Sequence, residues 1–478
     1  MVSFLVKLIV FITLIIPPLM LILLHTIYYA AGIRRHGLKQ FSTNKHIPKK
    51  HEVSILIPIK NEPEDLIVKA VKHLGKVLSN TESTEVLIIS DDPPEIASKI
   101  ASKVYETSNK LNLDVKFINR VEGPPGRAAA LSYGVLHSNG DVIIILDVDS
   151  RPSKGYIESL VKCLDEGYEA CVGRWTGYWD IPTKLARAIT ASMNFIVDTI
   201  YRGRASLGLF TYPLGSGSAF RKDSLINVGL WDPSVIQDDM YMGAKFLNRG
   251  FKIGYVDNVN VDVLVPSTYQ AFKIQQTRWA FGAANVLRRM FKYILKSPYP
   301  LIKRLEALMF LAQYVPQAIL GLSLLAIPLI TLICGDDVLF LNIYASVFTF
   351  MIFTAYAISF FHSLLRGHVF RLLGGSKVKL VRIMGTSGAM TLAISPLILY
   401  YTVKGLLFRT MRYKVTPKGA MERMLRSTFV FEKVITVILI ALLLTVLFLG
   451  HYPFTALWLG TAIASYIYVL TNIEKVVK

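Results

Sequence analysis

The chain has 478 residues, of which 53% are hydrophobic and 18% are charged, and its formal net charge is +20. Ordinary soluble proteins carry about 25% charged residues, so this composition excludes most soluble classes and indicates a membrane protein. The basic residues gather beside apolar segments and form neither a zinc-finger nor an RNA-binding motif, so we expect membrane lipids and no nucleic acid as partners.

Five stretches without charged side chains are long enough to cross a membrane. They cover residues 8–33, 307–335, 338–365, 383–403 and 434–473. We predict a transmembrane anchor at 1–33, two transmembrane helices within 301–365, and two more within 434–473, where glycine and proline interrupt the run.

The region 366–433 needs a different interpretation, because both flanks of its apolar stretch are basic. If this stretch crossed the membrane, one basic loop would lie outside the cell, against the positive-inside rule. We therefore predict an interfacial or re-entrant segment and five spanning helices in total. The same rule predicts a multi-pass protein of the cell membrane whose soluble region, 50–267, lies in the cytoplasm.

Short β-branched runs alternate with helical stretches between Val53 and Asp149. This alternation predicts a parallel, doubly wound α/β sheet, whose ligands bind at the carboxyl ends of the strands. Polar and acidic residues follow the expected strand ends at Asn61, Glu62, Asp91, Asp92, Asp147 and Asp149. Acidic residues also favour turns, but three sets at equivalent ends favour a shared site.

Two further groups suggest chemistry in the second half of the soluble region. Asp147 and Asp149 form a D-x-D pair suited to a divalent cation that binds a diphosphate. Asp238 and Asp239 could supply a general base, although on its own this pair fits a helix N-cap better. The three cysteines show no metal or disulfide spacing, which predicts buried thiols.

The region 268–300 is predicted to be an interfacial helix, because it is amphipathic and basic. It carries Gln275, Arg278 and Trp279 on one helical face, where an arginine could stabilise a diphosphate and a tryptophan could stack on a sugar. A plain interface helix with a snorkelling arginine is the alternative.

Together these motifs resemble glycosyltransferase family 2, and more narrowly its membrane-embedded branch with the cellulose, chitin and hyaluronan synthases. The resemblance covers residues 53 to about 282 and implies a GT-A-type α/β catalytic domain inserted between transmembrane helices. It also implies that Asp149, with Asp147, holds Mg²⁺ or Mn²⁺ and the diphosphate of a nucleotide sugar, with a UDP-sugar favoured.

Further roles follow from the same resemblance. Asn61, Glu62, Asp91 and Asp92 are expected at the nucleotide, and Asp239 is the expected general base with Asp238 beside it. The residues expected to bind the acceptor and the leaving group are Gln275, Arg278 and Trp279. The chain departs from the family pattern at Gln237-Asp238, where Thr-Glu is usual, and at Arg127, where lysine is common.

The segment Tyr413-Lys414-Val415-Thr416-Pro417-Lys418 resembles the gating loop of bacterial cellulose synthase. The resemblance implies that Val415, Thr416 and Lys418 contact the bound substrate and help to exclude water. A solvated basic loop is the alternative.

The resemblance implies an inverting, metal-dependent glycosyltransferase that extends a polysaccharide processively, with translocation of the product through its own helices as a further expectation. The alternative is transfer of a single sugar to a membrane lipid, because glucosylceramide synthases share the motif set. A nucleotide-binding transporter is a third interpretation, which the lack of paired hydrophobic repeats disfavours.

Overall fold

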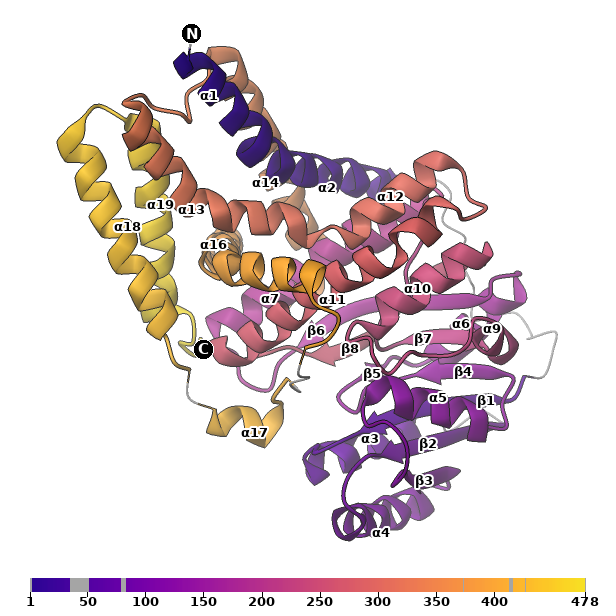
Figure 1. The fold of residues 1–478 in the computed structure, drawn as a ribbon. Helices are drawn as coiled ribbons and strands as arrows, with labels where there is room; N and C mark the ends of the chain where they lie inside the picture. The colour runs from indigo at the N-terminus through magenta and orange to yellow at the C-terminus, as the bar shows by residue number, and fades with distance from the viewer. Residues whose placement is uncertain are drawn as a thin grey trace.

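The computed structural model describes residues 2–34, 51–78, 83–372, 374–411, 416–425 and 427–477. Figure 1 shows a sheet-containing domain on one side and a group of long helices on the other. The eight strands lie in the order β3-β2-β1-β4-β7-β6-β8-β5. They are β1 (Val53–Ile59), β2 (Thr84–Ser90), β3 (Val115–Asn119), β4 (Val142–Ile145), β5 (Arg151–Pro152), β6 (Ala170–Tyr178), β7 (Ser218–Arg221) and β8 (Ile253–Leu264).

The first half of the sheet is parallel, as predicted: β1 pairs with β2 and β4, and β2 pairs with β3. The second half is mixed. Strand β7 runs antiparallel to both β4 and β6, whereas β6 and β8 run parallel to each other. The carboxyl ends of β1, β2 and β4 therefore share one edge of the sheet, next to the loop that enters β7.

Helices cover both faces of the sheet because strand residues alternate between two hydrophobic cores. Ile55 and Ile57 pack with α3, α4 and α6, whereas Leu56 packs with α5 and α10. The helices of this domain are α3 (Glu64–Val77), α4 (Pro94–Lys110), α5 (Arg127–His137), α6 (Tyr156–Asp165), α9 (Lys222–Asn227) and α10 (Asp238–Arg249).

Cys163 and Cys171 form a disulfide and the free Cys334 is exposed, which corrects the expectation of three buried free thiols. The end of α6 and the start of β6 lie side by side, with the two Cα atoms 6.2 Å apart. A tertiary contact between a helix and a strand makes this pair, so no short cysteine motif announces it.

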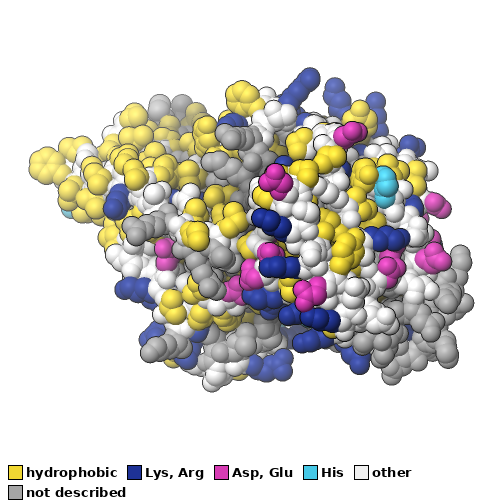
Figure 2. Space-filling model, turned by 90° about the horizontal axis from the view of Figure 1, so that it is seen from below, with side chains coloured by type: hydrophobic (Ala, Val, Ile, Leu, Met, Phe, Trp, Pro, Cys, Tyr) yellow, Lys and Arg dark blue, Asp and Glu magenta, His cyan; other side chains and the backbone are white. Residues whose placement is uncertain are grey.

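Six helices among the described residues are long and apolar enough to cross a membrane, rather than the five expected. They are Phe4–Arg34, which takes in most of α1 (Val2–Val10) with η1 (Phe11–Ile15) and α2 (Ile16–Arg34), and α13 (Tyr314–Cys334), α14 (Ile343–Arg366), α16 (Lys377–Leu407), α18 (Val430–Leu449) and α19 (Pro453–Asn472). Figure 2 shows the hydrophobic side chains gathered on one part of the surface and the charged ones spread over the rest.

The additional candidate is α16, which contains the stretch 383–403. It is one continuous helix through Pro396, so a re-entrant hairpin is excluded. It contacts two other candidate spans: Thr386 and the Tyr468 hydroxyl of α19 are 2.7 Å apart, and Gly321 of α13 lies against Ser395. The interfacial interpretation of this segment remains a prediction.

Two elements connect the membrane helices to the sheet domain. The helix α7 (Lys184–Ile196) continues through η2 (Val197–Gly203) and α8 (Arg204–Ser206), and Gly203 lies directly against the backbone of Tyr28 in α2. The helix α11 (Tyr269–Leu295) packs its first half on membrane helices and its second half on the sheet domain. The short helices α12 (Leu301–Leu311), α15 (His368–Leu372) and α17 (Gly419–Met424) complete the chain.

Candidate active site

The turn after β4 carries Asp147 and Asp149, and a loop of small residues holds it in place. The backbone N–H of Asp147 donates to Ser216 Oγ at 2.9 Å. Gly217 follows with φ +84°, and a β-carbon there would lie 2.5 Å from Tyr156 Oη. Only glycine fits this position, which explains the small residues beside the acidic turn.

Arg127, the first residue of α5, joins two acidic groups that are far apart in the sequence. Its Nε and Nη2 donate to Asp147 Oδ1 at 3.2 and 3.1 Å. Its Nη1 donates to Asp238 Oδ2, and Nη2 also donates to the carbonyl oxygen of Gly215. Burial opposes ionisation of Asp147, but the positive charges of Arg127, Lys418 and Arg278 together outweigh it, so the pKa of Asp147 is lowered from its usual value.

Lys418 reaches the same cluster from the segment before α17. Its Nζ lies 2.8 Å from Asp149 Oδ1, and the Asp149 side chain is only 4% exposed. Burial, together with the charges of Asp149, Asp147 and Asp92, raises the pKa of Glu62 to about 7, although Lys418 opposes the shift. The acidic residues that follow β1, β2 and β4 therefore meet at one edge of the sheet.

Asp91 and Asp92 are buried and bonded to the protein itself. Asp91 Oδ1 accepts from Arg120 Nη2 at 2.6 Å, and its Oδ2 accepts from the backbone N–H of Gly126 at 2.7 Å. Asp92 Oδ1 accepts from the backbone N–H of Asn61 at 2.6 Å. These bonds fix the loops before α3 and α5, so the expected contact of Asp91 and Asp92 with a nucleotide remains a prediction.

Asp238 and Asp239 form the first turn of α10, and the N-cap position itself is Gln237. Asp239 Oδ1 accepts from Gln237 Nε2 at 2.8 Å and from the backbone N–H of Met240 at 2.7 Å, while Oδ2 faces Gly215. Burial, and then the charge of Asp238, raise the pKa of Asp239 to about 6. This carboxylate is therefore a stronger base than an ordinary aspartate.

The face of α11 that carries Gln275, Arg278 and Trp279 is half-buried. Arg278 lies near enough to Asp147 that its positive charge helps to lower the pKa of that carboxyl. Its neighbour Gln276 accepts a hydrogen bond from the Tyr314 hydroxyl, at the start of α13, at 3.3 Å. This contact links α11 to a membrane helix.

Part of the predicted gating-loop-like segment can be placed. Val415 lies outside the described residues, and Thr416 is buried with no hydrogen-bond partner for its hydroxyl among them. Glu422 accepts from the backbone N–H groups of Ser267 and Thr268 at 2.7 and 2.8 Å, at the N-terminus of α11. The segment is thus bonded to the acidic cluster at one end and to α11 at the other.

Arg127 and Glu422 are site residues whose roles the sequence interpretation missed. Arg127 was noted only as a departure from the family pattern. Glu422 carried a detectable signal, because it is one of only two acidic residues between Lys404 and Lys433. The other, Glu432, pairs with Lys273 of α11 at 3.1 Å. Rare acids in a basic stretch thus marked the contacts with α11.

The carboxylates fit a hard divalent cation that shares its coordination with a substrate. Among the described residues, no group of three or more histidine, cysteine or acidic side chains forms a complete metal site. Asp147 and Asp149 supply two carboxylates at one turn, and Mg²⁺ typically takes one or two protein carboxylates and completes its shell with phosphates and water. The donor set suits a cation that arrives with a diphosphate.

The family profile of "Glycosyl transferase family 2" matches residues 54–229, and that of "Glycosyl transferase family group 2" matches residues 142–473. The fold and the acidic edge are those of a GT-A-like glycosyltransferase. The chain belongs to glycosyltransferase family 2, and it is an enzyme of nucleotide-sugar-dependent sugar transfer.

Individual relatives agree with this assignment. A "Probable glycosyltransferase" of Sulfolobus acidocaldarius is 30% identical over 458 residues, covering 95% of each chain. A "Poly-beta-1,6-N-acetyl-D-glucosamine synthase" of Staphylococcus aureus is 25% identical, covering 54% of this chain and 62% of the relative. "Glucomannan 4-beta-mannosyltransferase 7" of Arabidopsis thaliana is 24% identical, covering 51% and 45% respectively. Homologues thus include enzymes named for polysaccharides.

Proposed function

We propose that this protein is an inverting, metal-dependent membrane glycosyltransferase that extends a polysaccharide from a nucleotide-sugar donor at the cytoplasmic face. The observation that carries the proposal is the meeting of two acidic groups around Arg127. One group, Asp147 with Asp149, suits binding of the donor diphosphate through a cation. The other group, Asp238 with Asp239, lies on the opposite side of the Arg127 guanidinium. A diphosphate-binding group beside a basic carboxylate is the arrangement that glycosyl transfer requires.

In the proposed reaction, Asp239 accepts the proton of the acceptor hydroxyl as its oxygen attacks the anomeric carbon. A new glycosidic C–O bond forms, and the bond from the anomeric carbon to the nucleotide diphosphate breaks on the opposite face. Arg278 and Lys418 stabilise the negative charge of the departing diphosphate. When bound at Asp147 and Asp149, Mg²⁺ or Mn²⁺ supplies additional positive charge at the diphosphate.

A polysaccharide acceptor is supported by the relatives named for glucomannan and for poly-N-acetylglucosamine, although both match only about half of this chain. The position of the base supports the same choice. Tyr314, which begins the membrane helix α13, is bonded to α11 beside Gln275. An acceptor held at Asp239 therefore lies next to the membrane helices, where a growing chain could leave. A UDP-sugar is the donor that the motif resemblance favours.

The proposed topology places the catalytic domain, residues 50–267, in the cytoplasm. Arg366 ends α14, and the basic residues that follow it lie in α15 and at the start of α16; the positive-inside rule assigns them to the cytoplasmic side. Ser363, at the end of α14, donates to Asp198 of η2 at 2.8 Å. Ser192 of α7 donates to Ser387 of α16 at 3.0 Å. The first contact puts the end of α14 beside the catalytic domain, and the second does the same for the first part of α16, which favours an interfacial α16.

The direct test is to incubate the full-length protein in lipid with Mg²⁺ or Mn²⁺ and a panel of labelled sugar nucleotides, and then to size the product. High-mass, glycosidase-sensitive material is the expected result. Label confined to one solvent-extractable sugar adduct would favour a lipid acceptor and contradict polymer synthesis. Binding of nucleotide with no product from any donor, in either metal, would contradict the transferase proposal itself.

The pH dependence of transfer should report Asp239. A base must be deprotonated to act, and burial with the neighbouring Asp238 raises the pKa of Asp239 to about 6. We therefore expect kcat/KM to fall about tenfold per pH unit below that value and to level off above it. Rates measured between about pH 5 and 8 give this profile. Asp238→Asn removes a negative neighbour and should move the acid limb to lower pH; a flat profile in the wild type would contradict the assignment.

Replacing Lys418 by glutamine should weaken use of the donor. Lys418 is the cation on Asp149, and its loss leaves Asp149, Asp147 and Glu62 close together with less compensating charge. We expect kcat/KM for the donor to fall roughly a hundredfold, because one charged group facing the diphosphate is lost. Lys418→Arg should recover part of the activity, and the exposed Lys110→Gln on α4 serves as the control. An unchanged kcat/KM would favour the solvated-loop alternative.

A further inference from the structure

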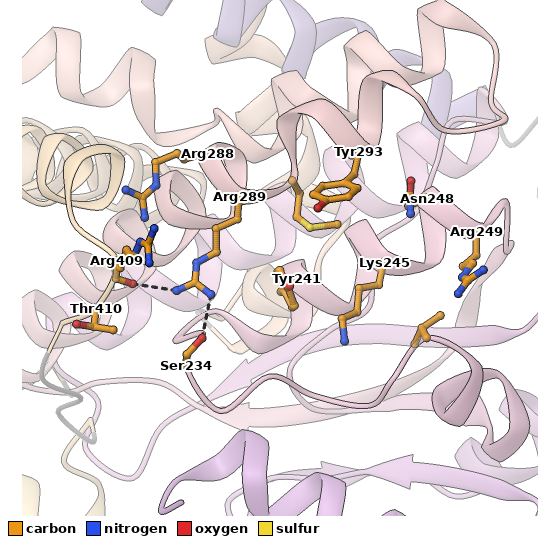
Figure 3. A pocket seen from close by; sticks show the side chains of 12 residues that line it. Ser234, Tyr241, Lys245, Asn248, Arg249, Arg288, Arg289, Tyr293, Arg409 and Thr410 are labelled. Carbon is orange, nitrogen blue, oxygen red and sulfur yellow. Dashed lines mark hydrogen bonds between the residues drawn. The ribbon is translucent and has the colours of Figure 1, made fainter.

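A cavity with a volume of about 850 Å³ lies beside α10, and no residue of the acidic cluster lines it. It is bounded by α10, the second half of α11, the loop before α10 and residues 409–410 after α16. Figure 3 shows Arg288, Arg289 and Arg409 gathered at one end, with Lys245 and Arg249 toward the other. None of the residues proposed above for sugar transfer lines this cavity.

The lining is strongly unbalanced in charge. Its cationic residues are Lys245, Arg249, Arg288, Arg289 and Arg409, and it contains no acidic residue. Within the described residues only Arg289 has a carboxylate partner, Asp232, at 3.5 Å. Arg288 donates instead to the carbonyl oxygens of residues 407 and 408, both at 3.1 Å. Like charges held this close are unfavourable unless an anion joins them.

The chemistry of the lining indicates which anion fits. Guanidinium groups bind phosphate in bidentate fashion, and the cluster around Ser234 offers hydroxyl groups as well. Tyr241 and Tyr293 supply aromatic surface between the two basic ends. A volume of this size exceeds a single phosphate and accommodates a phosphate with an attached polar group.

We call the apolar residues that lie in the cavity lining, or adjoin it in the sequence, the rim of the cavity, and they are exposed. Phe291 and Tyr293 of α11 are 46% and 55% exposed, and Leu407 and Phe408 at the end of α16 are 67% and 56% exposed. Exposed apolar residues beside a basic surface are typical of an element that lies in the membrane interface. A soluble phosphate compound would leave this rim uncovered, whereas the acyl chains of a lipid would cover it.

We propose that this cavity binds the phosphate-bearing headgroup of an anionic membrane lipid. The headgroup lies among Arg288, Arg289 and Arg409, and the acyl chains extend over Leu407 and Phe408. Lys245 is six residues beyond Asp239 on α10, about 9 Å along the helix axis, so the lipid is a separate ligand and not the sugar acceptor.

The lipid also has an effect on catalysis, because the cavity joins three parts of the catalytic machinery. The helix α10 begins with Asp239, α11 carries Arg278, and residues 409–410 precede the segment that delivers Lys418. Neutralising the clustered cations holds these parts together. An anionic lipid should therefore raise the transfer rate as well as bind.

The test compares lipid binding by the full-length protein and by two double variants. Arg288→Gln with Arg409→Gln removes two of the three charges at the proposed headgroup site. Lys377→Gln with Lys379→Gln removes the same charge from the exposed start of α16. Binding of phosphatidylglycerol against phosphatidylcholine is measured by native mass spectrometry and by titration in detergent, with no sugar donor present.

We expect the cavity variant to bind phosphatidylglycerol at least about tenfold more weakly, because each cation near an anionic lipid contributes a similar share of the binding free energy. The control variant should bind like the wild type. If both variants lost the same affinity for phosphatidylglycerol, or if neither lost any, the proposal would be overturned in favour of a diffuse attraction between the lipid and the basic surface. Displacement of the lipid by millimolar inorganic phosphate would overturn it in favour of a soluble phosphate ligand. Because the assay contains no donor, its result does not depend on the proposed sugar transfer.

Discussion

Replacing Asp239 by asparagine is expected to lower kcat by about 10²–10⁴-fold, the usual contribution of a general base. The amide has nearly the size of the carboxylate but cannot take the proton of the acceptor hydroxyl. The groups expected to hold the donor, Asp149 and Lys418 among them, are untouched by the change. Affinity for the nucleotide sugar should therefore stay within about twofold of the wild type. Initial-rate kinetics and a separate donor titration measure the two quantities.

Asp223→Asn is the matched control for this experiment. Asp223 is exposed on α9, far from the acidic edge, and should leave both quantities unchanged. If Asp239→Asn turned over substrate at the wild-type rate, Asp239 would not be the general base. Loss of donor binding together with turnover would instead assign Asp239 to positioning of the donor.

Replacing Glu306 by leucine is expected to lower the thermal unfolding midpoint by roughly 10 °C. Arg204 donates from Nε and Nη2 to the two Glu306 oxygens at 2.6 and 2.8 Å, and its side chain is only 2% exposed. Removing the partner leaves a buried guanidinium without compensation, which costs about 3–5 kcal/mol. The loss should be large because Tyr28 of α2 also donates to Glu306, at 3.2 Å. Unfolding is followed by heating the protein in detergent.

The double variant Arg204→Met, Glu306→Leu separates charge from packing. Removing both charges should recover most of the lost midpoint, because a well-packed apolar pair is often as stable as a buried ion pair. Asp65→Leu breaks an exposed pair with Lys69 on α3 and should change the unfolding free energy by less than about 1 kcal/mol. If the double variant instead lowered the unfolding midpoint further than Glu306→Leu alone, the shape of the two side chains, and not their charge, would matter at this contact.

The first half of the sheet could be predicted because its signals are local. Each strand from β1 to β3 is a short apolar run followed by a helix, β4 is a fourth such run that leads into the acidic turn, and the connections are short enough to read in order. The second half could not be predicted in the same way. The strand β7 has only four residues and lies between β4 and β6, so its pairing depends on residues far away in the chain.

The same distinction separates the parts of the candidate site. Acidic residues at the ends of β1, β2 and β4 were predictable as a group, because parallel strands bring their carboxyl ends to one edge. The contact of Arg127 with Asp238 joins residues 111 positions apart, and no pattern in the sequence indicates it. The disulfide between Cys163 and Cys171 was missed for the same reason, since it depends on where a helix ends beside a strand.

Charge patterns gave incomplete information about the membrane region. The basic flanks of 383–403 predict that both ends lie on one side of the membrane, and the contact of Ser387 with Ser192 of α7 places only the first part of α16 beside the catalytic domain. Length and apolar composition alone count α16 as a sixth span. Sequence rules treat each segment separately, whereas half of this helix is buried against its neighbours.

The segment before and within α17 is bonded to the rest of the protein at two points, and its backbone can rotate between them. Lys418 is held at Asp149, and Glu422 is held at the N-terminus of α11. Between them lies Gly419, whose φ of +54° belongs to a region that glycine enters without strain. Rotation of the backbone at Gly419 would move Lys418 away from Asp149 while Glu422 keeps its hydrogen bonds to the N-terminus of α11. The donor side could then open and close without disturbing the helix that presents Arg278 to the leaving group.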